Sequence, residues 1–433
     1  MLDPLAPDRV ALAEIALRID ADGTIAERAE AGSAAYAALS ADAHALHLDP
    51  ADLLLPGLTD LHIHAPQWPQ RGAALDRPLA QWLAAHTFPL EQRYADLAYA
   101  ESVYGELVPA LLAQGTTTAL YFATLHEPAS LALARTCLAH GQRGFVGLVA
   151  MDHPELCPPQ YRHPDAAAAI AATRRFIDAV RALPGNAAGL VQPVITPRFI
   201  PACTDALLAG LARLAAETGV RVQTHASESD WEHAHVLARC GCTDTEALDR
   251  FGLLRRHAVL AHGNFLDVQD LARIAAREAA VAHCPISNAF FADSVLPVRA
   301  LLDRGVNCGL GTDIAGGFSP SIFENARAAV LSARMLASGT DPGRAPAARG
   351  AGAAMRLAFT EALWLATRGG AQALGLSTGQ LAPGTPFDAI ELSGRGPVLR
   401  LDGPAEAVAQ RIVCHASAAE IGRVWVAGTC VKA

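Results

Sequence analysis

The middle of the chain alternates between two patterns of apolar and polar positions. Short apolar runs, typical of buried parallel strands, are followed by longer segments in which apolar residues recur at helical spacing. We expect strands at residues 117–122, 144–149, 190–195, 220–225, 258–262, 280–283 and 306–311, preceded by the run that ends at His64. The clearest helices between them are 131–139 and 205–218. This series predicts an α/β fold of the (β/α)₈ barrel type. An open doubly wound sheet is the less favoured alternative, because no Gly-x-Gly-x-x-Gly follows the first strand.

The two ends of the chain carry short strands and turns instead. Strands are expected at residues 10–19, 24–25, 384–392 and 421–429. Asp22-Gly23 lies between the first two, and Asp-Gly between apolar runs is a strong hairpin signal. We therefore expect residues 1–55 and 380–433 to build one small β-sandwich domain beside a barrel at 56–379. The segment 340–354 is rich in Gly, Ala, Pro and Arg and is expected to be a mobile surface loop.

Polar side chains gather where the predicted barrel strands end. These residues are His62, His64, Arg198, His225, His262, His283 and Asp313. In a barrel the carboxyl ends of all strands meet at one face, which holds the active site. His62 and His64 also project from the same side of their strand, because side chains at i and i+2 share a face. The pattern predicts a cluster of imidazoles and a carboxylate.

Such a cluster has the chemistry of a metal site. Three histidines and one carboxylate, His62, His64, His225 and Asp313, can hold a divalent ion with a position left for water. The nitrogen and oxygen donors suit Zn²⁺, and Fe²⁺ also fits them. Such an ion lowers the pKa of its water from 15.7 to about 7, on the order of 12 kcal/mol of nucleophile activation.

Neighbouring residues could handle the protons of this reaction. Glu228 follows His225 by three residues and is expected to shuttle a proton between the water and the substrate. His262 could be a ligand, an orienter of the water or a core histidine, and the orienter is favoured. Asp313 could take a proton from the water as well as bind the metal. For His283, structural support and chemistry both stay open.

Two other spacings have a simpler explanation. His233 and His235 lie on a predicted helix, where side chains at i and i+2 diverge, so a solvated face is expected. Cys240 and Cys242 form the only close cysteine pair and are expected to be two unpaired thiols.

Composition narrows the possible partners. A net charge of −9 argues against nucleic-acid binding, which needs a basic face. No apolar stretch has the length of a membrane span. The start, Met1-Leu2-Asp3-Pro4, lacks the pattern of a secretory signal, and the nine cysteines are scattered. We expect a reduced, cytoplasmic protein with a large apolar core.

Five segments together resemble the amidohydrolase superfamily, in its mononuclear aminohydrolase branch. They are residues 56–64 (Pro-Gly-Leu-Thr-Asp-Leu-His-Ile-His), 224–228, 260–263, 283–288 and 309–313. Narrower motifs resemble the guanine deaminases of that branch. These lie at residues 64–69, 82–91, 115–124 and 195–199.

The resemblance implies a reaction and a division of roles. It implies hydrolytic deamination of guanine to xanthine and ammonia, with one Zn²⁺ per chain on the four ligands named above. Glu228 would protonate the purine ring nitrogen, and His262 and Asp313 would steer the water and its proton. Gln67, Arg198 and Phe199 would bind the base, whose edge needs both donors and an acceptor. The resemblance also suggests a homodimer.

The sequence also bears on several alternative functions. Binuclear relatives that use a carboxylated lysine are excluded, since no lysine precedes Lys432. The compact cytidine-deaminase type needs Pro-Cys-x-x-Cys, which the chain lacks. A deaminase or chlorohydrolase of another amino-heterocycle (8-oxoguanine, a pterin, a triazine or an adenosine-type base) would share every ligand and differ at Gln67 and Arg198. A non-catalytic scaffold protein on this fold would be expected to lose metal ligands, and all four are present.

Overall fold

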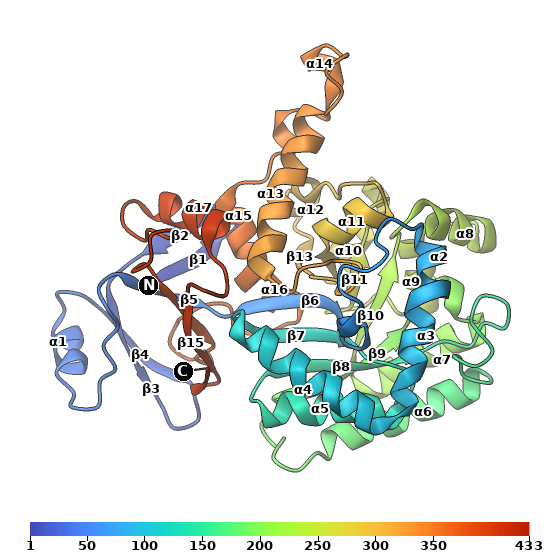
Figure 1. Cartoon of the computed structure of the whole chain (residues 1–433), viewed down its shortest axis with the longest axis horizontal. Helices are drawn as coiled ribbons and strands as arrows, with labels where there is room; N and C mark the ends of the chain where they lie inside the picture. The colour runs from blue at the N-terminus through green and yellow to red at the C-terminus, as the bar shows by residue number, and fades with distance from the viewer. Residues whose placement is uncertain (433) are drawn as a thin grey trace.

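The computed structural model describes residues 1–432, and within them eight parallel strands form a barrel (Figure 1). In sheet order these are β6 (Leu58–His64), β7 (Thr116–Phe122), β8 (Arg143–Ala150), β9 (Val191–Pro197), β10 (Arg221–Ala226), β11 (Val259–His262), β12 (Ala280–His283) and β13 (Asn307–Leu310). Backbone hydrogen bonds close the barrel just beyond β13. The Asp313 N–H donates to the His62 carbonyl at 2.8 Å, and the His64 N–H donates to the Ile314 carbonyl at 2.9 Å. The predicted (β/α)₈ barrel is confirmed.

Helices between the strands cover the outside of the barrel. The longer ones are α4 (Leu97–Ala113), α5 (Glu127–Ala139), α6 (Ala166–Arg181), α7 (Asp205–Thr218), α8 (Asp230–Cys240), α9 (Asp244–Phe251), α10 (Val268–Ala276) and α13 (Ile322–Ser338). Shorter ones are α2 (Leu79–Trp82), α3 (Phe88–Gln92), α11 (Pro285–Phe291), α12 (Val298–Leu302), α14 (Pro346–Arg349), α15 (Phe359–Trp364) and α16 (Gly370–Ala373). In the described part of the chain, no helix combines the length and apolar character that crossing a membrane requires.

Helix α7 illustrates how local sequence sets an element's ends. The Thr204 side chain accepts a hydrogen bond from the Leu207 N–H, which satisfies one of the free donors of the first turn. Gly219 ends the helix in the left-handed conformation, with φ of 68°. The observed bounds, Asp205–Thr218, are those predicted from the apolar spacing.

Both ends of the chain share one small antiparallel sheet, seen on the left in Figure 1. Its order is β16 (Thr429–Lys432), β15 (Ile421–Val426), β14 (Ala389–Ser393) and β5 (Asp52–Pro56). Two hairpins accompany it, β1 (Leu2–Ala6) with β2 (Arg9–Leu12) and β3 (Ile15–Ile19) with β4 (Ile25–Glu30). Ile25 of the second hairpin is buried with Phe387, Ala389 and Trp425, so the hairpin packs on the sheet. The expected terminal β-domain is present.

The ends differ from the sequence expectation in two details. The predicted strand at 10–19 is broken at Ala13 and Glu14, while the turn at Asp22-Gly23 is present, with Gly23 at φ of 81°. The ends also contain helices α1 (Ala34–Ser40) and α17 (Ala405–His415). From the pairing of β5 with β14, we propose that the small domain comprises 1–55 with 380–433 and the barrel 56–379.

The segment 340–354 lies at the far end of α13 and projects from the barrel around α14 (Figure 1). Nearly all its residues are exposed, which agrees with the predicted surface position.

Candidate active site

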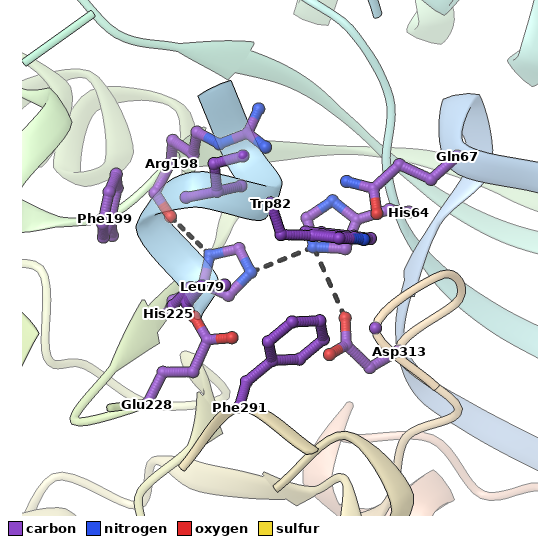
Figure 2. Close-up of a pocket in the computed structure, with 12 residues that line it drawn as sticks. His64, Gln67, Leu79, Trp82, Arg198, Phe199, His225, Glu228, Phe291 and Asp313 are labelled. Carbon is purple, nitrogen blue, oxygen red and sulfur yellow. Dashed lines mark hydrogen bonds and ion pairs between the residues drawn. The ribbon is translucent and has the colours of Figure 1, made fainter. Parts of the chain in front are cut away.

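The structure brings together the four residues predicted to bind a metal. His62 and His64 end β6, His225 lies on β10 and Asp313 follows β13, and all four are buried. His64 Nε2 lies 3.0 Å from His225 Nε2, and His62 Nε2 lies 3.0 Å from Asp313 Oδ1. His64 Nε2 is 3.6 Å from the same Asp313 oxygen. Figure 2 shows His64, His225 and Asp313 pointing toward one another.

The donor atoms fit a divalent cation. Ligand atoms at tetrahedral corners with metal–nitrogen bonds of roughly 2.0–2.1 Å lie about 3.3 Å apart, and the three distances above bracket that value. Burial lowers the pKa of His62, His64 and His225 well below 6.5, so each imidazole is neutral, the form that binds metal. The 3.0 Å contact of His62 Nε2 with Asp313 lacks hydrogen-bond geometry, so among the described residues this buried atom has no hydrogen-bond partner, which buried polar atoms usually have.

The orientation of His225 is fixed from behind by Arg198. His225 Nδ1 donates to the Arg198 backbone carbonyl at 2.6 Å. The proton therefore sits on Nδ1, and the Nε2 lone pair faces the cluster. Because Arg198 directly follows β9, the end of one strand orients a ligand on the next.

Asp60, which sequence reasoning did not assign, ties the two ligand segments together. Its carboxylate accepts hydrogen bonds from the His62 N–H at 3.1 Å, the Thr312 N–H at 3.0 Å and the Thr312 hydroxyl at 2.6 Å. Burial raises the pKa of Asp60 to about 7. The approach of the two segments also needs Gly311, since a Cβ there would lie 2.8 Å from the Cβ of His62.

A second group of donors, Glu228, His262 and Asp313, lies beside the first. His262 Nε2 is 3.7 Å from Glu228 Oε1 and 3.9 Å from Asp313 Oδ2. His262 Nδ1 lies 3.0 Å from Asn288 Oδ1, which leaves Nε2 directed at the two carboxylates. This agrees with an orienting role, while the further group of His62, His225 and His262 keeps a ligand role open.

The surroundings of Glu228 favour its protonated form and hold its backbone in place. Burial, and then the negative charge of Asp313, raise the pKa of Glu228 well above 4.5. Its backbone is held in place, because its N–H donates to Glu232 Oε2 at 2.7 Å and its carbonyl accepts from Asn264 Nδ2 at 2.8 Å. A neutral carboxylic acid near neutral pH can act as a general acid.

These groups border a pocket with about 380 Å³ of empty space, its open mouth included (Figure 2). Its walls are His64, Gln67, Leu79, Trp82, Leu83, Arg198, Phe199, His225, Glu228, Phe291, Asp313 and Gly316. The predicted base-binding residues Gln67, Arg198 and Phe199 all line it. Sequence reasoning gave no role to Trp82 and Phe291, whose rings lie 5.0 Å apart, since a single apolar residue there looks like any core residue.

A buried glutamate holds two of the residues predicted to bind the base. Glu91 Oε2 accepts from Arg198 Nη1 at 2.7 Å, and Glu91 Oε1 accepts from Arg198 Nη2 at 3.2 Å and Gln67 Nε2 at 2.9 Å. Burial lowers the pKa of Arg198, but the Glu91 carboxylate outweighs it and keeps that pKa above its ordinary value. Sequence reasoning did not assign Glu91 either.

Two of the histidines singled out from the sequence, His283 and His233, lie outside the cluster. His283 is buried, its pKa is lowered to about 3 by burial, and neither ring nitrogen has a partner in the described chain. His233 is half-buried rather than solvated as expected. Its Nδ1 lies 3.3 Å from both Asp244 Oδ2 and Ser227 Oγ, because the start of α9 approaches the turn before Glu228.

The fold and the site define a class of protein: a (β/α)₈ barrel with a histidine–aspartate cluster that could hold a metal ion at the carboxyl ends of its strands. Residues 53–431 match the model of the Amidohydrolase family, and the chain belongs to that family.

Individual relatives are similar over most of the chain. A probable guanine deaminase of Schizosaccharomyces pombe is 39% identical over 348 residues, which cover 79% of this chain and 63% of the relative. The guanine deaminase of Dictyostelium discoideum is 36% identical over 342 residues, covering 78% and 72%. The crystal structure of guanine deaminase from C. acetobutylicum with bound guanine has a TM-score of 0.88 at 27% identity, covering 99% of this chain and 97% of that one.

Proposed function

We propose that this chain catalyses the hydrolytic deamination of guanine to xanthine and ammonia. The observation that carries the proposal is one pocket in which Arg198 and Gln67 face the histidine–aspartate cluster. The family and the guanine deaminases to which the chain is similar, one of them with guanine bound, support it.

The ion that we propose is a single Zn²⁺ per chain. His62, His64, His225 and Asp313 would hold it, and the same nitrogen and oxygen donors would accept Fe²⁺. When bound, such an ion acts as a Lewis acid and lowers the pKa of water to about 7.

Arg198, Gln67 and Phe199 would position the base. Arg198 and Gln67 offer N–H donors to the guanine carbonyl at the buried end of the pocket. Phe199 and Trp82 supply apolar walls that exclude water from the ring. The carbon that bears the exocyclic amine would then lie next to Glu228.

Glu228 would move the protons. As water oxygen bonds to the amine-bearing carbon, Glu228 gives its proton to the adjacent ring nitrogen, while Asp313 accepts a proton from the water. His262, through Nε2, would orient that water. The carbon–nitrogen bond then breaks, and the amine leaves as ammonia with protons returned through the two carboxyl groups. One water is consumed, and xanthine and ammonia are formed.

We also propose a cytoplasmic location, from the scattered cysteines, and a homodimer, from the family resemblance. Light scattering of the purified protein tests the dimer, and a monomer at micromolar concentration would contradict it.

The function is tested by incubating the metal-loaded protein with guanine and following the ultraviolet change to xanthine. No turnover would reject the proposal, and faster turnover of a pterin, a triazine or an adenosine-type base would reassign the substrate. Stoichiometric metal in the purified protein is expected, and its absence together with inactivity would favour a scaffold protein.

A further inference from the structure

Glu91 lies between the two polar side chains that would meet the base. It belongs to α3, which follows a π-helical turn at residues 83–87. The Glu91 side chain has no exposed surface, and the side chain of its partner Arg198 is only 3% exposed. The Glu91 carboxylate accepts three hydrogen bonds from the Arg198 and Gln67 side chains, and these bonds offset the free-energy cost of removing its charge from water.

The Arg198 guanidinium is held in one position by this contact. Two parallel N–H bonds to the two oxygens of Glu91 fix its plane, and the ring of Phe88 lies 5.0 Å from its central carbon. Arg198 lines the pocket (Figure 2), and a guanidinium has five N–H groups, of which Glu91 uses two. Glu91 itself does not line the pocket.

The amide of Gln67 is held at both ends. A carboxylate only accepts hydrogen bonds, so Glu91 requires the NH₂ end of Gln67, which lies 2.9 Å away. The other end, Oε1, accepts from the Ala315 N–H at 3.1 Å. Turning the amide over would face NH₂ with N–H and oxygen with carboxylate, so the spare Gln67 N–H is fixed as a donor.

We propose that Glu91 is a positioning residue that determines substrate specificity. It makes the edge of the pocket formed by the Arg198 and Gln67 side chains a donor of hydrogen bonds and never an acceptor. A donor-only edge binds a ring carbonyl and rejects a ring amine, because opposing N–H groups would be buried without partners. The inference rests on the proposed function and narrows its substrate class to 6-oxo purines.

Comparing two substrates distinguishes an effect on specificity from a general effect on catalysis. Guanine and 2,6-diaminopurine both carry an amine on the reactive carbon and differ in having oxygen or NH₂ at position 6. In the metal-loaded wild type, kcat/KM should favour guanine by on the order of 10²–10⁴-fold. Hydrolysis of the second substrate would release ammonia and give the 2-oxo-6-amino purine, so one ammonia assay serves both.

In Glu91→Gln the ratio should fall at least about tenfold, because the new amide can donate to Gln67 and release its orientation. Glu91→Asp keeps the charge for Arg198 but is one methylene too short to reach Gln67 as well. Glu91→Asp should lower the ratio of kcat/KM for the two substrates by a smaller factor. It is the variant to measure if Glu91→Gln does not fold.

Glu391→Gln is the matched control. Glu391 is also buried and binds an arginine with both oxygens, at 2.6 and 3.0 Å from Arg423, but it lies in the small sheet. This variant should lose stability and keep the wild-type substrate ratio.

The results separate the two proposals. Equal slowing of both substrates in Glu91→Gln, or equal use of both by the wild type, would overturn the role of Glu91 and leave guanine deamination standing. A wild type that releases no ammonia from guanine would overturn the proposed function instead.

Discussion

Replacing Asp60 by asparagine tests whether ligand geometry depends on the contact between β6 and the segment that carries Asp313. The carboxylate accepts three hydrogen bonds, two from Thr312 and one from the His62 N–H. Asparagine keeps one oxygen for the two backbone donors. Its NH₂ group meets the Thr312 hydroxyl, which donates in the wild type at 2.6 Å and would have to turn and accept instead, and the negative charge that strengthens all three bonds is gone.

The magnitude follows from the loss of the charge on the acceptor. Hydrogen bonds to charged groups contribute about 1.5–3 kcal/mol and neutral ones about 0.5–1.5 kcal/mol, so the free energy of unfolding should fall by about 1–2 kcal/mol. Residues that orient metal ligands typically account for about 10–100-fold in metal affinity, and we expect a loss in that range for Asp60→Asn. Because the pKa of Asp60 is raised to about 7, the comparison belongs at pH 8, where the wild-type carboxylate is mostly ionised.

The assay is competition for Zn²⁺ against a chelator, with thermal unfolding followed in parallel. Asp388→Asn is the control, because Asp388 is also buried and accepts three hydrogen bonds, two from Arg143 at 3.1 Å and one from the Ala427 N–H at 2.7 Å. The control should lower stability and leave Zn²⁺ affinity unchanged. If Asp60→Asn lowers stability while its Zn²⁺ affinity stays within twofold of the wild type, the reasoning is refuted.

Three further predictions concern the proposed acid Glu228, the proposed Zn²⁺ and the pH dependence of stability. Glu228→Gln should retain Zn²⁺ by elemental analysis while kcat falls by about 10²–10⁴-fold, and full activity would remove Glu228 from the mechanism. Chelation should destabilise the fold by about 4 kcal/mol relative to Zn²⁺ at 1,000 times its Kd, so an unchanged melting temperature would argue against the site. The hydrogen bond from Arg423 holds the pKa of Glu391 below 4.5, so its stabilisation is present above the unfolded pKa and is lost as pH falls through the folded one. The stability difference between wild type and Glu391→Gln, about 1 kcal/mol at pH 7, should therefore shrink below pH 4, and a constant difference would contradict this.

The barrel and the histidine–aspartate cluster could be predicted because their signals are local. Each strand is a short apolar run, and the predicted ligands His64, His225 and Asp313 lie at or near the ends of such runs. The order and direction of the strands follow from the repeated strand–helix pattern. The meeting of these three side chains at one face could therefore be predicted without knowing any side-chain contact.

The residues that were missed act through contacts between distant segments. Glu91 and Arg198 are 107 positions apart, and although Glu91 ends the motif at 82–91, that motif does not indicate which residue Glu91 contacts. Asp60 and Thr312 are 252 apart. Helix α17 was not predicted, although Val408, Ala409 and Ile412 have the apolar spacing of a helix, because this signal lies between two segments with strand patterns.

The backbone at the barrel mouth carries strain that helps to aim the side chains. Ser227, His262 and Asp313 have φ of 53°, 74° and 47°, a region that costs a residue with a side chain of order 1–3 kcal/mol. Each follows or ends a strand, and neighbouring strands hold it there. The Asp313 N–H bonds to β6 at 2.8 Å, and the N–H groups of Gly263 and Asn264 bond to the end of β10 and to Ser227, both at 2.9 Å. These bonds offset the strain, so the chain turns sharply at the strand ends, and Glu228, His262 and Asp313 face one another across the pocket instead of continuing outward.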